Sequence, residues 1–176
     1  MNPYLTKVGA SVKPIRMLLD WTQAELSKHT GLSRSTIINI ENEPWRMTRS
    51  SSIVFFSVIL TEMTRRMQQL EKYTTTEPID WQELLQDLRL SNPRSWSHIL
   101  GPVGLVATGL IPVLGGIAMV TAGTSKNLTE NDHKKLKHAV AETLHELSMK
   151  LCQLFELEAL SLDLFIKKLD EEENAR

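Results

Sequence analysis

The sequence predicts an all-α protein. Apolar residues recur at helical spacing along most of the 176 residues, and the alternation of apolar and polar residues that is typical of a half-buried strand is not found. Side chains that cap helices precede several of these segments. Apolar residues make up 41% and charged residues 23% of the chain, which excludes a wholly disordered or fibrous protein.

The first two helices are predicted near the start of the chain. Pro14 suits the first turn of a helix whose core-facing side is formed by Ile15, Leu18 and Leu19. Thr22, followed three residues later by Glu25, has the pattern of a capping box, so we expect the second helix from there to about His29.

The next two helices follow a predicted turn. Gly31 stands where the second helix needs a residue with a positive φ in order to end. Ser33 is the N-cap of a third helix over residues 34–41, which packs on the second through Leu26, Leu32, Ile37 and Ile40. Residues 48–52 offer caps for a fourth helix built on Ile53, Phe56, Ile59, Leu60 and Met63.

The rest of the chain divides into further sections. Residues 74–94 combine a linker, 74–78, with a short amphipathic helix over 79–90 that carries Ile79, Leu84, Leu85 and Leu88 on one face. Residues 95–125 contain no Asp, Glu, Lys or Arg. Residues 126–176 hold a long amphipathic pattern over 130–170, typical of a dimerisation or partner-binding helix, and core packing within one chain is the alternative.

Charge is distributed unevenly along the chain. Net charge is −1, yet residues 1–73 carry ten Lys and Arg against six Asp and Glu, and the remainder carries ten against fifteen. A basic N-terminal part followed by an acidic C-terminal part indicates that a nucleic-acid-binding module, residues 1–73, is joined to another region.

The stretch WTQAELSKHTGLSRSTIINIE resembles the Cro/cI-type, or XRE, family of transcriptional regulators over about residues 12–63. The resemblance implies a five-helix-type helix-turn-helix domain, here followed by a helical C-terminal region with an apolar Gly/Pro-rich segment. It also implies a homodimer that binds double-stranded DNA at a two-fold symmetric operator and acts as a repressor. One departure is that the usual glycine after the recognition helix is missing from the sequence Glu41-Asn42-Glu43-Pro44-Trp45.

The resemblance also implies roles for individual residues. On the recognition helix, which lies in the major groove, Arg34, Ser35 and Asn39 face bases. Thr36 lies at the groove edge or on a phosphate, and Gln23 contacts the DNA backbone. The DNA-binding set is completed by Ser33, Arg46 and Arg49, with both arginines in a second phosphate-contact region.

The apolar segment over residues 99–123 admits three interpretations. Its 25 residues without a charge are long enough for a transmembrane helix, and its glycines and prolines are tolerated in lipid. A shallow membrane hairpin and two short helices buried in a soluble oligomer fit equally well. Membrane contact through this segment and a buried core therefore remain open alternatives.

Other sites are not expected. His138, Glu142 and His145 share a helical face that points away from the apolar stripe, so we expect a solvated surface and no metal. Motifs for catalysis or for a cofactor are not found, and the sequence specifies no small-molecule effector. The single cysteine, Cys152, and the lack of a signal peptide favour a cytoplasmic protein. The alternative function is a protein-interaction or membrane-associated protein that keeps the helix-turn-helix fold without reading DNA.

Overall fold

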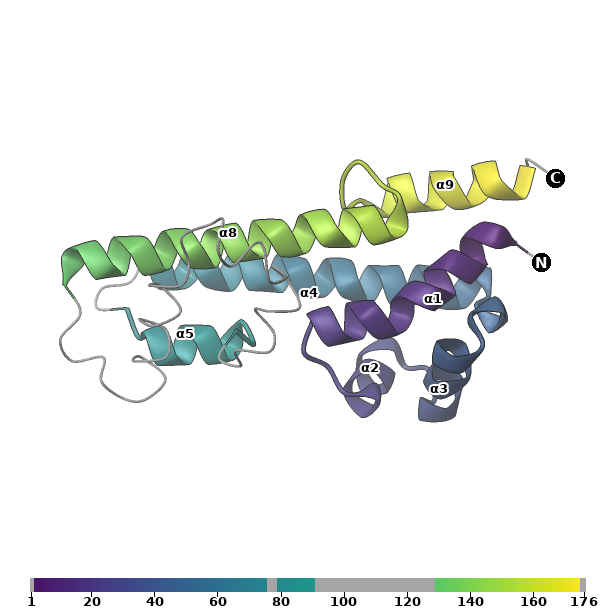
Figure 1. The fold of residues 1–176 in the computed structure, drawn as a ribbon, viewed down its shortest axis with the longest axis horizontal. Coiled ribbons are helices and arrows are strands. Elements are labelled where there is room, and N and C mark those ends of the chain that lie inside the picture. Colours follow the sequence, from purple (N-terminus) through teal and green to yellow (C-terminus); the bar gives the residue numbers. More distant parts are fainter. Residues whose placement is uncertain (1, 76–78, 91–128, 175–176) are drawn as a thin grey trace. The chain divides into compact units, whose positions relative to one another are not determined.

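The computed structural model describes residues 2–75, 79–90 and 129–174, and every regular element among them is a helix (Figure 1). The prediction of an all-α fold is therefore confirmed. The elements are α1 (Pro3–Leu18), α2 (Gln23–Thr30), α3 (Arg34–Asn42), the short 3-10 helix η1 (Pro44–Arg46), α4 (Arg49–Thr75), α5 (Trp81–Asp87), α8 (Glu130–Phe155) and α9 (Leu162–Asn174). The N-terminal region, up to the end of α4, thus contains five helical elements when η1 is included.

These residues belong to two compact units. The first unit comprises Met1–Met63 together with Ser148–Arg176, and the second comprises Thr64–Leu147. The first unit therefore draws on both ends of the chain. The division into four sequence sections stays a prediction, because compactness alone does not show which segments fold independently.

Helix α1 begins eleven residues before the predicted position of its first turn. Asn2 is its N-cap, with a side chain that accepts hydrogen bonds from the backbone N–H groups of Tyr4 and Leu5, and Pro3 lies at its start. Pro14 is an exposed residue inside the helix, so its assignment to the first turn was wrong. The helix continues through Pro14 because a long apolar face outweighs the lost hydrogen bond. That face consists of Tyr4, Val8, Val12, Ile15 and Leu18, all buried.

Helix α4 begins as predicted. The Thr48 hydroxyl accepts a hydrogen bond from the Ser51 backbone N–H at 3.1 Å, which satisfies one of the unpaired donors at the helix start. Within the first unit, Phe55, Phe56, Ile59 and Met63 of this helix are buried, while Ile53 and Leu60 are half-buried.

The long C-terminal pattern forms two helices, so the prediction of one continuous helix over 130–170 was wrong. Helix α8 ends at Phe155, and Glu156 has a φ of 54°, in the left-handed region. The Leu157 N–H bonds the Cys152 carbonyl at 2.9 Å, which closes the helix end. The turn between the two helices allows α9 to place the Phe165 ring against the Phe155 ring, with centroids 5.6 Å apart.

An aromatic cluster forms the core of the first unit. Phe56 of α4 stacks on Phe165 of α9 with centroids 4.3 Å apart and an interplanar angle of 2°. Phe155 of α8 meets Phe56 edge-on at 4.8 Å, and Tyr4 of α1 lies 6.3 Å from Phe165. Helices from both ends of the chain therefore share one core, in which aromatic pairs add to the effect of apolar burial.

Among the described residues, the second unit contains the C-terminal part of α4, from Thr64, together with α5 and α8 up to Leu147. Asp80 is the N-cap of α5, whose residues Leu84 and Leu85 are buried, as is Leu88 directly after it. Thr129 caps α8 by accepting a hydrogen bond from the Asp132 N–H. The apolar stripe of α8 in this unit, Leu136, Val140, Leu144 and Leu147, is buried. The dimerisation or partner-binding role of this region and the alternative of core packing both stay predictions.

The apolar segment 99–123 lies outside the described residues, so its three interpretations stay predictions. Among the residues that are described, none of the helices is both long enough and apolar enough to span a membrane.

Candidate nucleic-acid interface

Local hydrogen bonds build the turn between α2 and α3. Thr22 and Glu25 form the predicted capping box: the Glu25 N–H donates to the Thr22 hydroxyl at 3.2 Å, and the Thr22 N–H donates to the Glu25 carboxylate at 2.7 Å. Gly31 ends α2 with a φ of 70°, as predicted. The Ser33 hydroxyl then caps α3 by accepting a hydrogen bond from the Thr36 N–H at 3.1 Å. Each signal involves residues at most five positions apart, which explains why the sequence predicted all of them.

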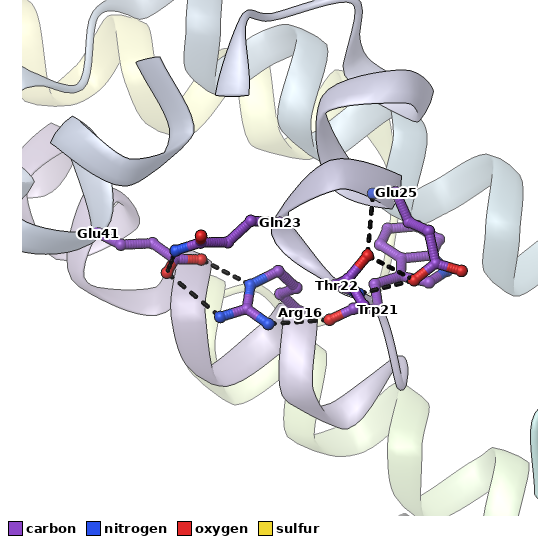
Figure 2. Close-up of polar contacts among 6 residues, drawn as sticks. All are labelled: Arg16, Trp21, Thr22, Gln23, Glu25 and Glu41. Atoms are coloured by element: carbon purple, nitrogen blue, oxygen red, sulfur yellow. Dashed lines mark hydrogen bonds and ion pairs between the residues drawn. The ribbon is translucent and has the colours of Figure 1, made fainter. Parts of the chain in front are cut away.

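A buried ion pair fixes α3 relative to α1 and α2 (Figure 2). The Arg16 guanidinium donates to both carboxylate oxygens of Glu41, at 2.6 and 3.2 Å, and to the Trp21 carbonyl at 2.8 Å. The Glu41 carboxylate also accepts a hydrogen bond from the Gln23 side-chain amide at 2.9 Å. The two charged side chains are only 14% and 4% exposed, so the pair acts as an internal tie among three helices.

The electrostatics of Glu41 follow from these contacts. Burial alone would raise the pKa of its carboxyl group, but the hydrogen bonds from Arg16 and Gln23 more than compensate, and the pKa is lowered. The carboxylate therefore stays charged at neutral pH and holds both donors.

Sequence reasoning assigned no role to Arg16. Its position three residues before Leu19, on the edge of the apolar face of α1, gave no local signal for a partner 25 residues away.

The outer side of α3 presents the residues predicted to face bases. Arg34, Ser35 and Asn39 are exposed, whereas Ile37 and Ile40 on the opposite side are buried. Among the described residues, Arg34 has no ion-pair partner. The structure thus brings a guanidinium, a hydroxyl and a carboxamide together on one accessible helix face.

Hydroxyl groups gather at the start of α3. The Ser33 hydroxyl lies 2.8 Å from both the Ser35 and the Thr36 hydroxyls. Thr36 is half-buried, which fits a place at the edge of the helix face rather than at its centre. Because hydroxyl groups both donate and accept, this group can satisfy itself or turn toward a phosphate.

The remaining predicted residues are already engaged within the protein. The Gln23 amide bonds Glu41, which leaves its second N–H as the donor for an outside acceptor. Arg46 of η1 pairs with Glu43 at 2.6 Å. Arg49 of α4 pairs with Asp170 at 2.6 Å and with Glu173 at 3.1 Å, both on α9. Neither acidic residue of α9 was identified from the sequence, because they lie more than 120 positions from Arg49.

A metal site is not supported in the part of the chain that the structure covers. His138 and Glu142 of α8 form an exposed pair at 3.2 Å. The described residues contain no group of three or more His, Cys, Asp or Glu side chains that could hold a metal ion.

Comparison with known proteins identifies the class of this N-terminal region. Residues 12–44 match the Helix-turn-helix family, and they cover α2, the turn and α3. The resemblance of this part of the chain to helix-turn-helix regulators of the Cro/cI, or XRE, type is therefore confirmed.

A curated protein is similar over part of its length. The antitoxin HipB of Escherichia coli O6:H1 (strain CFT073) is 35% identical over 54 residues, which are 31% of this chain and 54% of that protein. The chain thus spans about half the length of the relative it matches. No solved structure matches the chain.

Proposed function

We propose that the protein is a sequence-specific DNA-binding transcriptional regulator. The single observation that carries the proposal is the exposed face of α3, where Arg34, Ser35 and Asn39 stand on a helix that the capped turn and the Arg16–Glu41 pair hold in place. Arginine suits the acceptor edge of guanine, and asparagine pairs with adenine in the major groove. The family match and the similarity to HipB support the same assignment.

The finer proposal is a repressor. A homodimer would place two copies of α3 in successive major grooves of a two-fold symmetric operator, and occupation of the operator would block transcription. In this proposal Gln23, Arg46 and Arg49 contact phosphates, and the domain binds DNA without catalysing a reaction.

Binding-site selection from a randomised duplex pool tests this proposal. We expect the full-length protein to enrich a two-fold symmetric sequence. Arg34→Ala should relax the preference at one base position of each half-site, at a cost of about 1–3 kcal/mol on the selected site. Gln23→Ala should weaken binding to every sequence alike, because phosphate contacts carry no sequence information.

A matched control removes the same charge elsewhere. Lys28→Ala deletes an exposed cation near the end of α2, away from the proposed base-contacting side chains. It should leave the selected sequence unchanged. Equal losses on all sequences from Arg34→Ala and Gln23→Ala would contradict the assigned roles.

One observation favours a second candidate, a helix-turn-helix used only for protein contacts. Arg46 and Arg49 both have acidic partners within the chain, so two of the three arginines predicted to reach DNA are neutralised. A folded dimer that binds no duplex at any salt concentration would support this candidate and contradict the first.

A further inference from the structure

The acidic residues at the end of α9 lie on two different faces of that helix. Glu171 pairs with Lys167 at 3.8 Å, and Glu172 pairs with Lys168 at 3.3 Å, both one helical turn away. Asp170 and Glu173 are three residues apart and therefore share a face, and both pair with Arg49 at the start of α4. The acidic segment is thus divided into a self-paired face and a face that binds Arg49.

Arg49 binds these carboxylates as it would bind a phosphate. Its Nη2 atom donates to an Asp170 oxygen at 2.6 Å, and its Nη1 atom donates to a Glu173 oxygen at 3.1 Å. In the same way, one arginine guanidinium donates hydrogen bonds to two oxygens when it binds a phosphate group. Both terminal nitrogens of the guanidinium therefore already donate to carboxylates of α9.

The apolar core holds α9 in the position that makes this contact. Phe165 and Leu169 of α9 are buried, and Phe165 stacks on Phe56 of α4. Asp170 directly follows Leu169, so its carboxylate is carried to Arg49 by a packed helix rather than by a free tail. Each of the three charged side chains is nonetheless 34–52% exposed, so water, salt and an incoming anion can reach the pair.

The charge of the whole first unit is consistent with a competing role for α9. Residues 1–63 carry seven Lys and Arg against five Asp and Glu, whereas residues 148–176 add four against seven. The unit that contains the helix-turn-helix therefore has a formal charge of −1 instead of the +2 of its N-terminal part. A less positive net charge means a weaker electrostatic attraction to the DNA backbone.

We propose that α9 is an intramolecular competitor of DNA: Asp170 and Glu173 occupy the Arg49 guanidinium that a backbone phosphate would otherwise engage. DNA binding at Arg49 requires exchange of the two carboxylates for a phosphate. Substitutions that remove the contact of α9 with Arg49 therefore strengthen DNA binding at a given salt concentration. This inference rests on the proposed function, since it presupposes that the domain binds DNA.

A charge-matched pair of double variants tests the proposal in the full-length chain. Asp170→Asn with Glu173→Gln removes the two carboxylates that face Arg49. Glu171→Gln with Glu172→Gln removes the same number of charges from the same helix but leaves the Arg49 contacts intact. Binding is measured by fluorescence anisotropy with a labelled random-sequence duplex over a salt series, because a phosphate contact does not depend on sequence.

We expect the first double variant to bind about two- to fivefold more tightly than the second, the range that exposed ion pairs of this kind allow. Its salt dependence should also steepen, by about one unit in the slope of log K against log salt for each phosphate gained. In the Arg49→Ala background the difference between the two double variants should disappear, because the shared partner is gone.

The possible results separate this inference from the proposed function. Equal affinities for the two double variants, with DNA binding retained, would overturn competition at Arg49 and leave the DNA-binding assignment in place. Absence of duplex binding by the wild type and every variant at low salt would overturn both. The single substitutions Asp170→Asn and Glu173→Gln, with circular dichroism as a check of folding, give the same comparison if the double variant does not fold.

Discussion

Gly9 of α1 lies where the backbone of η1 comes close to the helix. A Cβ atom at this position would lie 2.2 Å from the Pro44 carbonyl oxygen and 2.9 Å from the Pro44 carbonyl carbon. Both atoms belong to the backbone of η1, so no flexible side chain can move aside. The loop that departs from the family pattern therefore packs directly on α1, at a position that only glycine can occupy without a shift.

Gly9→Ala should therefore destabilise the protein, although alanine is ordinarily the better residue inside a helix. We expect the free energy of unfolding to fall by about 1–3 kcal/mol, the usual cost of overpacking. Urea titration followed by circular dichroism measures this change.

Gly31→Ala is the comparison for the Gly9 substitution. No atom lies within 4 Å of the Cβ position of Gly31, so only its φ of +70° is unfavourable to alanine, which should cost about 1 kcal/mol. A Gly9→Ala variant as stable as the wild type would mean that η1 does not pack on α1 in this way.

Among the elements, α9 is the one whose position changes the interpretation of the domain. It follows α8 after a left-handed residue, Glu156, and inserts Phe165 between helices that come from the other end of the chain. The helix-turn-helix unit consequently includes a C-terminal helix that the family match, residues 12–44, does not cover.

Phe165→Ala should destabilise the unit by about 3–5 kcal/mol, because a fully buried aromatic ring is replaced by a cavity. Leu164→Ala is the matched control: Leu164 is the neighbouring residue and one of the exposed large apolar side chains, so its loss should change stability by no more than about 0.5 kcal/mol. Thermal unfolding monitored by circular dichroism compares the two. Similar effects of both substitutions would contradict the packing of Phe165 in the aromatic cluster.

The elements also show what can and cannot be predicted from the sequence. The caps of α2, α3 and α4 depend on hydroxyls and amides within a few residues, so local pattern was sufficient. The start of α1 was misplaced because Pro14 resembles a first-turn proline, although Asn2, Pro3 and the spacing of Tyr4, Val8 and Val12 carried the correct signal. The break at Glu156 was missed because the sequence around it contains neither the glycine nor the proline that usually marks the end of a helix.

At the candidate site, too, the sequence predicted local features but not contacts between distant residues. The exposed face of α3 followed from helical periodicity together with the family resemblance. The partners of Arg16 and Arg49 did not, because the chain separates each of them from its carboxylates by 25 or more residues. Sequence reasoning therefore identified which side chains stand on the helix face but not which of the cations are already paired.

On the scale of the whole molecule, a contact between the two ends of the chain closes the first unit. The Tyr4 hydroxyl of α1 donates a hydrogen bond to the Phe155 carbonyl, the last residue of α8, at 2.6 Å. Carbonyl groups at a helix C-terminus lack partners within the helix, so the tyrosine supplies a donor that is otherwise missing. Nearby, Lys7 of α1 pairs with Glu156 at 2.6 Å.

The ionisation of Tyr4 couples this closure to pH. Burial is the main cause that raises the pKa of the Tyr4 hydroxyl above its ordinary value of 10.0, and the negative charges of Glu156 and Glu172 act in the same direction. A tyrosine whose pKa is raised in the folded state adds to the free energy of unfolding, and this contribution is fully present at pH values below the pKa of the unfolded state. That contribution is lost as the pH rises from there through the folded-state pKa, because the unfolded chain then releases a proton that the folded chain retains.

We therefore expect the free energy of unfolding to decrease above about pH 10 by up to about 1.4 kcal/mol per pH unit from Tyr4. Tyr4→Phe should cost about 1 kcal/mol at neutral pH, since it leaves the Phe155 carbonyl without its donor, and should remove this part of the alkaline decrease. Urea titrations at a series of pH values measure both effects.

Tyr73→Phe supplies the control, because Tyr73 belongs to the second unit, where its hydroxyl bonds Asp87 at 3.2 Å. Tyr73→Phe should keep the part of the alkaline decrease in the free energy of unfolding that Tyr4 causes. Parallel loss of stability above pH 10 in the wild type and in Tyr4→Phe would show that the hydroxyl does not bridge α1 and α8. The attachment of the C-terminal segment to the helix-turn-helix unit would then have to depend on the aromatic cluster and on the pairs of Arg49 and Lys7 alone.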